Sequence, residues 1–169
     1  MNMMALRCGD DLIVIDAGSL FPGVELLGVD LVVPDITYLV ENRKHIRGLI
    51  LTHGHEDHIG ATPYVLSQLD LPIYTTSFTS ALVRRKLKEH NLPKPPTIHT
   101  VELGDKVSLG CFEIELIRVT HSIPDAAALA IKTPLGKVIH TGDFKIDHTP
   151  IDGNPVSLAD LARISQDGV

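Results

Sequence analysis

The sequence predicts a single α/β domain built in layers. Segments typical of strands alternate with segments typical of helices along the chain, which is the pattern of layered α/β folds. Of the 169 residues, 44% are apolar, which is enough for a substantial core. Neither an internal repeat nor a long linker divides the chain, so we expect one domain over residues 1–169.

The first half of the chain predicts three strands and three helices. Short apolar runs such as LIVI and GLIL indicate buried strands. Ile36, Leu39 and Val40 recur at helical spacing, and Asp35 is placed to cap that helix. Phe78 is expected on the apolar face of the last helix, opposite the basic run RRKLK. The expected elements are strands at 12–16, 48–52 and 71–75 and helices at 36–43, 61–69 and 77–90.

The second half predicts a run of strands followed by a helix. After a proline-stiffened loop at 91–96, short apolar segments are separated by Gly or Pro. The segment FEIELIRV alternates apolar and polar residues at first, as in a sheet with one wetter face. Ser157 can cap the final helical pattern. The expected elements are strands at 106–109, 112–119, 127–133 and 137–141 and a helix at 158–166.

The composition excludes several classes of protein. A formal net charge of -6 excludes the strongly basic surface of the simplest nucleic-acid-binding domains. The apolar runs are far shorter than the roughly 20 residues of a membrane-spanning helix, and the N-terminal segment does not resemble a secretory signal. We therefore expect a cytoplasmic protein without a membrane partner. Cys8 and Cys111 make no disulfide framework and lack the spacing of a thiolate metal site, so two half-buried thiols are expected.

The stretch LTHGHEDHIG at 51–60 crowds metal-binding side chains behind a buried strand. In an extended chain His53 and His55 point to the same side and can hold one ion together, whereas Asp57 and His58 point elsewhere and suit a second ion. Imidazole and carboxylate groups are the ligands that zinc prefers where no thiolate is offered, and open sites of this kind are typically catalytic. The whole run HGHEDH, placed directly after a strand, therefore predicts a metal site.

Further ligands are expected from the ends of other strands. His121 and Asp143 each follow a strand, at the same rim of the sheet to which the strand before the histidine run delivers His53. The two oxygen atoms of Asp143 suit a bridge between two ions about 3.5–4 Å apart, as in two-metal hydrolases. Asp16 ends an earlier strand and is expected to orient a ligand histidine by a hydrogen bond.

The remaining histidines are expected to play smaller parts. His45, His90 and His99 lie in polar or loop contexts and are expected at the surface. His140 is expected in the core or in support of a ligand rather than as a ligand itself. His148 is left open as a contact to substrate.

These motifs resemble those of the metallo-β-lactamase superfamily. The run HGHEDH is similar to the His-x-His-x-Asp-His motif of that superfamily, and Asp16, His121 and Asp143 fall in the order and context of its other ligand motifs. The phrases VIDAGSLFPG, DLVVPDITYL, THSIPDA and IHTGDFKID resemble the ribonuclease J family of β-CASP nucleases along nearly the whole chain.

The resemblance implies a four-layer αββα fold and hydrolysis of RNA by a zinc-activated hydroxide, both endonucleolytically and from the 5′ end. Zinc, up to two ions, is the implied cofactor, with manganese as the alternative, and RNA is the implied substrate. Asp57, His58 and Asp143 become the candidate catalytic residues. The implied ligands of the first ion are His53, His55 and His121. Those of the second ion are Asp57 and His58. Asp143 is implied to bridge the two ions.

Compared with that family, the sequence is expected to be a partial domain, truncated at both ends. The first strand of the family, its β-CASP insertion, its C-terminal domain and a late histidine of the second metal site have no counterpart in residues 1–169. Three interpretations stay open: a nuclease of the ribonuclease J type, a metallo-hydrolase of a small ester, thioester or lactam, and a metal-binding fragment without catalysis. The oligomeric state is also open, with a homo-oligomer among the options.

Overall fold

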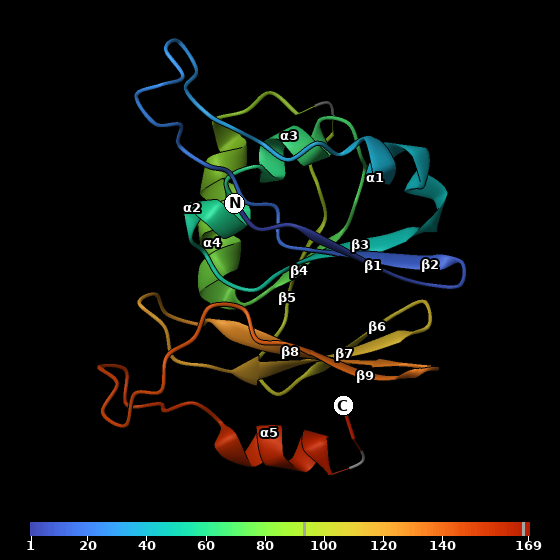
Figure 1. Ribbon diagram of the computed structural model, residues 1–169, viewed down its shortest axis with the longest axis vertical. Coiled ribbons are helices and arrows are strands. Elements are labelled where there is room, and N and C mark those ends of the chain that lie inside the picture. The colour runs from blue at the N-terminus through green and yellow to red at the C-terminus, as the bar shows by residue number, and fades with distance from the viewer. Residues whose placement is uncertain (93, 167) are drawn as a thin grey trace.

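Two β-sheets packed face to face form the centre of the protein. The computed structural model describes residues 1–92, 94–166 and 168–169. Figure 1 shows helices on the outer side of each sheet, with α1 to α4 over one sheet and α5 over the other, so that the layers follow the order αββα. This is the layered α/β fold that the sequence predicts.

Among the described residues, the first sheet has five strands and is mostly parallel. β1 and β2 form an antiparallel pair, and β2 to β5 run parallel. The sequence does not predict β1 or β5, because β1 is largely exposed and β5 has only three residues. In spatial order the strands are β1 (Met4–Cys8), β2 (Asp11–Ile15), β3 (Ile46–Leu51), β4 (Ile73–Thr75) and β5 (Ile98–Thr100).

The second sheet is antiparallel throughout. Its expected strands are confirmed, and their ends differ from the expected ones by one residue at most. Two-residue turns join β6 to β7 and β8 to β9, and a longer loop at 119–126 joins β7 to β8. These connections contain the Gly and Pro residues that separate the apolar segments in the sequence. In spatial order the strands are β6 (Lys106–Leu109), β7 (Phe112–Arg118), β8 (Ala127–Thr133) and β9 (Gly136–His140).

Short helices cover the first sheet. The helix expected at 36–43 ends at Glu41 and is followed by a 3-10 turn, η1 (Arg43–His45). The expected cap is wrong, because the N-cap of α1 is Ile36 and no side chain caps this helix. Asp35 lies one residue earlier, where its carboxylate accepts a hydrogen bond from the backbone N–H of Thr37 at 2.8 Å in a local turn. The α-helices are α1 (Thr37–Glu41), α2 (Glu56–Ile59), α3 (Thr62–Leu66), α4 (Ser77–Lys88) and α5 (Leu158–Ser165).

Two further expectations about the helices are wrong, and one short helix was not expected. The helix expected at 61–69 is confined to α3, and the histidine run contains a single helical turn, α2, which is too short to show any periodicity in the sequence. Phe78 is not in the core but 39% exposed, because α4 buries the face that carries Thr79, Val83 and Leu87 instead.

Side chains from both sheets fill the space between them. On β2, Ile13 and Ile15 join the cluster between the sheets, while Leu12 and Val14 join the cluster under the helices. A strand that is buried on both faces has an unbroken apolar sequence, which explains the run LIVI. On the outer side of the second sheet, Ile117 packs in the cluster that α5 covers.

Both cysteines are half-buried, as expected. Burial and the neighbouring Cys8 thiol raise the pKa of Cys111 to about 11. Both lie at the end of the molecule where β1 and β2 turn, since Cys8 pairs with Asp11 across that hairpin and Asp11 in turn accepts a hydrogen bond from the Cys111 N–H. Within the described ranges, no helix has the length and apolar character needed to span a bilayer.

Candidate metal centre

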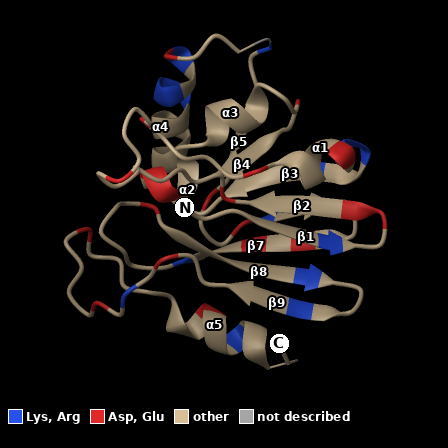
Figure 2. Cartoon of the chain, turned by 45° about the horizontal axis from the view of Figure 1, so that its top comes forward, with Lys and Arg blue, Asp and Glu red and all other residues tan. Residues whose placement is uncertain are grey.

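Three loops bring metal-binding side chains to one end of the two sheets. The histidine run follows β3, His121 follows β7, and Asp143 follows β9. Gly54 lets the run pass close to α4, since a Cβ at this position would lie 2.5 Å from Cδ1 of Leu82. Figure 2 shows acidic residues at α2, beside this end, whereas the basic residues of β8 and β9 lie at the opposite end of those strands.

His53, His55 and His121 form a compact cluster of imidazole rings. The Nε2 atoms of His53 and His121 each lie 3.1 Å from Nδ1 of His55. One nitrogen atom from each of the three rings lies within 4.8 Å of the other two. The ligands of a tetrahedral zinc ion, each at about 2.0–2.1 Å from it, are about 3.3 Å apart, so this spacing suits a shared ion.

The surroundings keep two of these imidazoles, those of His53 and His121, neutral. His53 is 1% exposed, and burial, followed by the neighbouring His58, His55 and His121, lowers its pKa to about 3. Burial and the neighbouring His55 also lower the pKa of His121. A metal ion binds the neutral form of histidine, so these rings need not lose a proton to bind at neutral pH.

A second group of possible ligands adjoins the first. Nitrogen atoms of His53 and His58 and an oxygen atom of Asp143 lie within 4.8 Å of one another. Oδ1 of Asp143 lies 3.5 Å from Nε2 of His58, and its Oδ2 lies 3.8 Å from Nε2 of His121. The two oxygen atoms of Asp143 therefore face one histidine of each group.

Asp57 stands slightly apart from both groups. Its Oδ2 lies 3.6 Å from Nε2 of His58, and its side chain is 46% exposed. Among the described residues it belongs to neither set of atoms that converge within 4.8 Å. Its Oδ1 makes no hydrogen bond to any described residue, which leaves that atom open to solvent or to a ligand.

Asp16 is buried beneath the site and holds His58. Its Oδ2 lies 2.8 Å from Nδ1 of His58, and its Oδ1 accepts a hydrogen bond from the backbone N–H of Thr52 at 2.8 Å. Burial acts to lower the pKa of His58, but the hydrogen bond and charge of Asp16 outweigh it, so that this pKa is raised. β2 ends one residue earlier than expected, because Asp16 has a φ of 60°, a conformation that side chains other than glycine rarely adopt.

Asn2 joins the site, although no spacing in the sequence predicts it. Its Nδ2 lies 2.9 Å from Oδ2 of Asp57 and 2.9 Å from Nε2 of His58. Its backbone N–H donates to the carbonyl oxygen of Asp57 at 2.7 Å, and its own carbonyl accepts from the Gly18 N–H at 2.8 Å. A Cβ at Gly18 would overlap the Asp57 carbonyl, so only glycine permits this close packing.

Two of the remaining histidines lie near the site without joining either group. Nδ1 of His140 accepts a hydrogen bond from the Gly142 N–H at 3.3 Å, which helps to shape the turn before Asp143. His148 lines a separate cavity beyond this turn.

The sequence comparisons agree with this geometry. Residues 2–166 match the family described as the metallo-beta-lactamase superfamily. The chain belongs to the metallo-β-lactamase superfamily. It is 48% identical over 169 residues to ribonuclease J of Helicobacter pylori, covering 99% of this chain and 24% of that protein. It is 42% identical to ribonuclease J of Thermus thermophilus, covering 99% of this chain and 30% of that protein. The chain thus spans about a quarter to a third of the length of these curated relatives.

Solved structures of the metallo-β-lactamase fold superimpose on the chain. The short form of human tRNase Z gives a TM-score of 0.60 with 17% sequence identity, covering 96% of this chain and 66% of that one. A protein of unknown function from Enterococcus faecalis gives a TM-score of 0.62 with 20% identity, covering 87% of this chain and 41% of that one. At such low identity these likenesses support the shared fold alone.

The donor atoms fit the divalent metal that this superfamily implies. His53, His55 and His121 direct nitrogen atoms at one another, and three neutral rings cannot all be satisfied by hydrogen bonds to each other. Asp143 supplies the negative charge that divalent ions require. The hydrogen bond that Nδ1 of His58 donates to the Asp16 carboxylate is the kind of outer contact that fixes the orientation of a ligand histidine.

Proposed function

We propose that this chain carries the metal centre of a ribonuclease J-type enzyme, a metal-dependent phosphodiesterase that acts on RNA. One observation supports this above all others: Asp143 faces a histidine of each ligand group, as a bridge between two ions requires. The identity of 36–48% to ribonuclease J relatives over 99% of the chain supports RNA rather than another substrate of the superfamily.

In this proposal each group of ligands holds one ion. The nitrogen-rich first group favours zinc, while the second group, with its carboxylates, also suits manganese. Bound at such a centre, divalent ions make water a better nucleophile and offset negative charge on phosphate oxygen atoms. The residues proposed for the first ion are His53, His55 and His121. Those proposed for the second ion are His58 and Asp57. Asp143 is proposed to be shared by the two.

The neighbouring side chains would orient the ligands and move protons. Asp16 fixes the ring of His58 through Nδ1 and leaves Nε2 directed toward Asp143. Asp57 is the group best placed to accept a proton from an attacking water, because its Oδ1 has no partner among the described residues and its side chain reaches solvent. Asn2 would restrain the other oxygen of Asp57.

The test is to offer the metal-loaded protein three substrates side by side. These are RNA with a 5′ monophosphate and a label at the 3′ end, a chromogenic lactam, and a thioester. We expect hydrolysis of the RNA alone. Release of mononucleotides from the 5′ end would identify exonucleolytic cleavage. Shorter labelled fragments would identify endonucleolytic cleavage.

A matched pair of variants makes this test specific. His121→Asn should abolish both hydrolysis and the binding of one ion, whereas His99→Asn should change neither, because His99 stacks on Tyr74 away from the site. Hydrolysis of only the lactam or the thioester would replace this proposal with a small-substrate enzyme. Bound metal without hydrolysis of any substrate would leave a metal-binding domain.

A further inference from the structure

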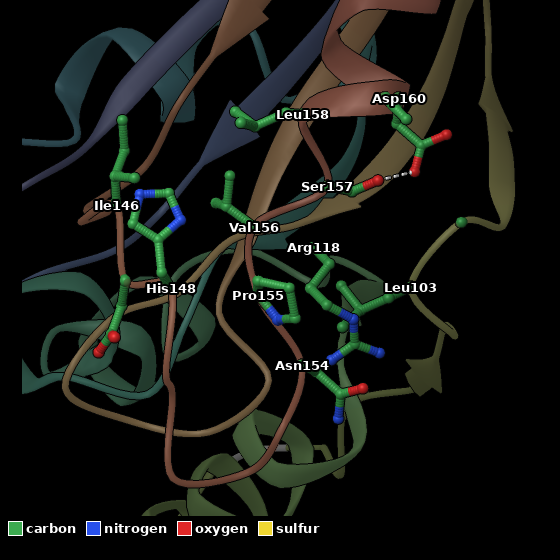
Figure 3. A pocket seen from close by; sticks show the side chains of 13 residues that line it. Leu103, Arg118, Ile146, His148, Asn154, Pro155, Val156, Ser157, Leu158 and Asp160 are labelled. Atoms are coloured by element: carbon green, nitrogen blue, oxygen red, sulfur yellow. Dashed lines mark hydrogen bonds between the residues drawn. The ribbon is translucent and has the colours of Figure 1, made fainter.

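A cavity of about 590 Å³ lies beyond the metal centre, between the end of β7 and the start of α5. Figure 3 shows side chains from separate parts of the chain around it, including Leu103, Arg118, His148 and Val156. The backbone here is fixed, because the N–H of Ser157 donates to the carbonyl oxygen of Arg118 at 3.1 Å. The cavity is therefore built by a strand end and by the segment that leads into α5.

This cavity adjoins a second one, which lies beside the metal centre. A neighbouring cavity of about 390 Å³ is lined by His121 and by the loop after β7. The two cavities share Arg118 and Asp147 in their linings. They therefore adjoin at these residues, and we call the two cavities together the groove; its lining extends from His121, a proposed metal ligand, to α5.

Arg118 provides the groove with an unneutralised positive charge. Its guanidinium group makes no ion pair and no hydrogen bond with any described residue, since its only polar contacts run through its backbone. The two acids in the first cavity are already paired. Asp147 contacts Nζ of Lys145 at 2.8 Å, and Asp160 contacts Arg163 at 3.2 Å.

The distribution of acidic residues makes the cavity between Arg118 and α5 the more favourable part of the groove for an anion. In the cavity beside His121, Asp125 and Asp152 have no cationic partner among the described residues; their carboxylates accept hydrogen bonds from the N–H groups of Phe78 and Asn154. That stretch disfavours a phosphate group unless metal is near. In the first cavity the two acids are neutralised by their cationic partners, so the positive charge of Arg118 remains and favours an anion there.

We infer that Arg118 binds a backbone phosphate of a single-stranded RNA that runs from the metal centre along this groove. This inference rests on the function proposed above. A guanidinium group forms two parallel hydrogen bonds to phosphate oxygen atoms, and an unpaired one is free to do so. Ile146, Val156 and Leu158 line the same cavity and offer apolar surface to sugars and bases. No Phe, Tyr or Trp lines it within the described residues, so affinity comes from charge rather than from aromatic stacking.

The experiment measures RNA binding without turnover. A fluorescent single-stranded RNA is titrated with the full chain in EDTA, and its anisotropy is followed at several salt concentrations. The variants are Arg118→Ala, Arg118→Gln, which keeps a long polar side chain without the charge, and the control Arg43→Ala, which removes an exposed arginine from η1. Circular dichroism establishes that each variant is folded.

Loss of one phosphate contact has a defined signature. Both Arg118 variants should bind about tenfold more weakly, and the slope of the logarithm of affinity against the logarithm of salt should become shallower by about 0.7, the contribution of one phosphate on a single strand. Arg43→Ala should match the wild type in affinity and slope.

The possible results separate the two claims. If the wild type binds and hydrolyses RNA but Arg118→Gln keeps its affinity and its salt slope, the phosphate site is refuted and the proposed function stands. If Arg43→Ala loses as much as Arg118→Gln, binding follows net charge alone and the site is likewise refuted. If the wild type neither binds nor hydrolyses RNA, both claims fail.

Discussion

Lowering the pH should destabilise the metal-free protein through His53. Its pKa is lowered to about 3 in the folded protein, chiefly by burial, from 6.5 in the unfolded chain. Between these values the unfolded chain binds a proton on His53 and the folded protein does not, so stability is lost as the pH falls below about 6.5. The loss is about 1.4 kcal/mol per pH unit, or about 2 kcal/mol at pH 5 relative to neutral pH.

His58 has the opposite sign and must be separated from this effect. Its pKa is raised, because Asp16 outweighs the effect of burial. Its contribution to stability is therefore present below 6.5 and is lost as the pH rises through the folded value. Since His58 is present in both the wild type and a His53→Gln variant, the difference between those two proteins reports the titration of His53 together with its coupling to the neighbouring rings.

The assay is urea unfolding in EDTA at neutral pH and at about pH 5. Between the two conditions the wild type should lose about 2 kcal/mol more than His53→Gln. A His99→Gln control, which changes an exposed histidine on β5, should lose as much as the wild type. Equal losses in the wild type and His53→Gln would refute the claim that burial keeps this imidazole neutral.

Three further substitutions test the site. Asp143→Asn should lower metal content by elemental analysis and hydrolysis together; unchanged metal content would exclude a bridging role. Asn2→Ala should lower the affinity for the second ion by about 10- to 100-fold in calorimetric titration and leave the affinity for the first unchanged; an equal loss of affinity for both ions would contradict a local role at Asp57. Gly18→Ala should lower the free energy of unfolding by about 1–3 kcal/mol, because its Cβ would overlap the Asp57 carbonyl; wild-type urea unfolding would contradict this.

The strands of the core could be predicted from the sequence because a strand that is buried on both faces has a continuous run of apolar residues. β2 and β3 lie between helices and the second sheet, so their runs contain almost nothing but apolar residues. β1 and β5 lack this signal, since their pairing is set by β2 and β4 rather than by their own side chains. Phe78 shows the limit of apolar spacing, because polar Thr79 occupies the buried face of α4 in its place.

The candidate site was predictable where ligands follow strand ends, and it was not where tertiary packing brings in a partner. The positions of His121 and Asp143 could be expected because β7 and β9, on either side of β8, run in the same direction and end at one edge of the layers. Asn2 could not, because its contacts to Asp57 and His58 depend on the close approach of Gly18. The positive φ of Asp16 is likewise a product of the folded site.

The most direct test is X-ray absorption spectroscopy of the zinc-loaded protein, backed by anomalous diffraction to locate each ion. Zinc should be surrounded by nitrogen and oxygen atoms at about 2.0–2.1 Å, with the strongest anomalous peak between His53, His55 and His121. A shell of sulfur atoms at about 2.3 Å, or a peak near Cys8 and Cys111, would contradict a metal centre built from this histidine cluster.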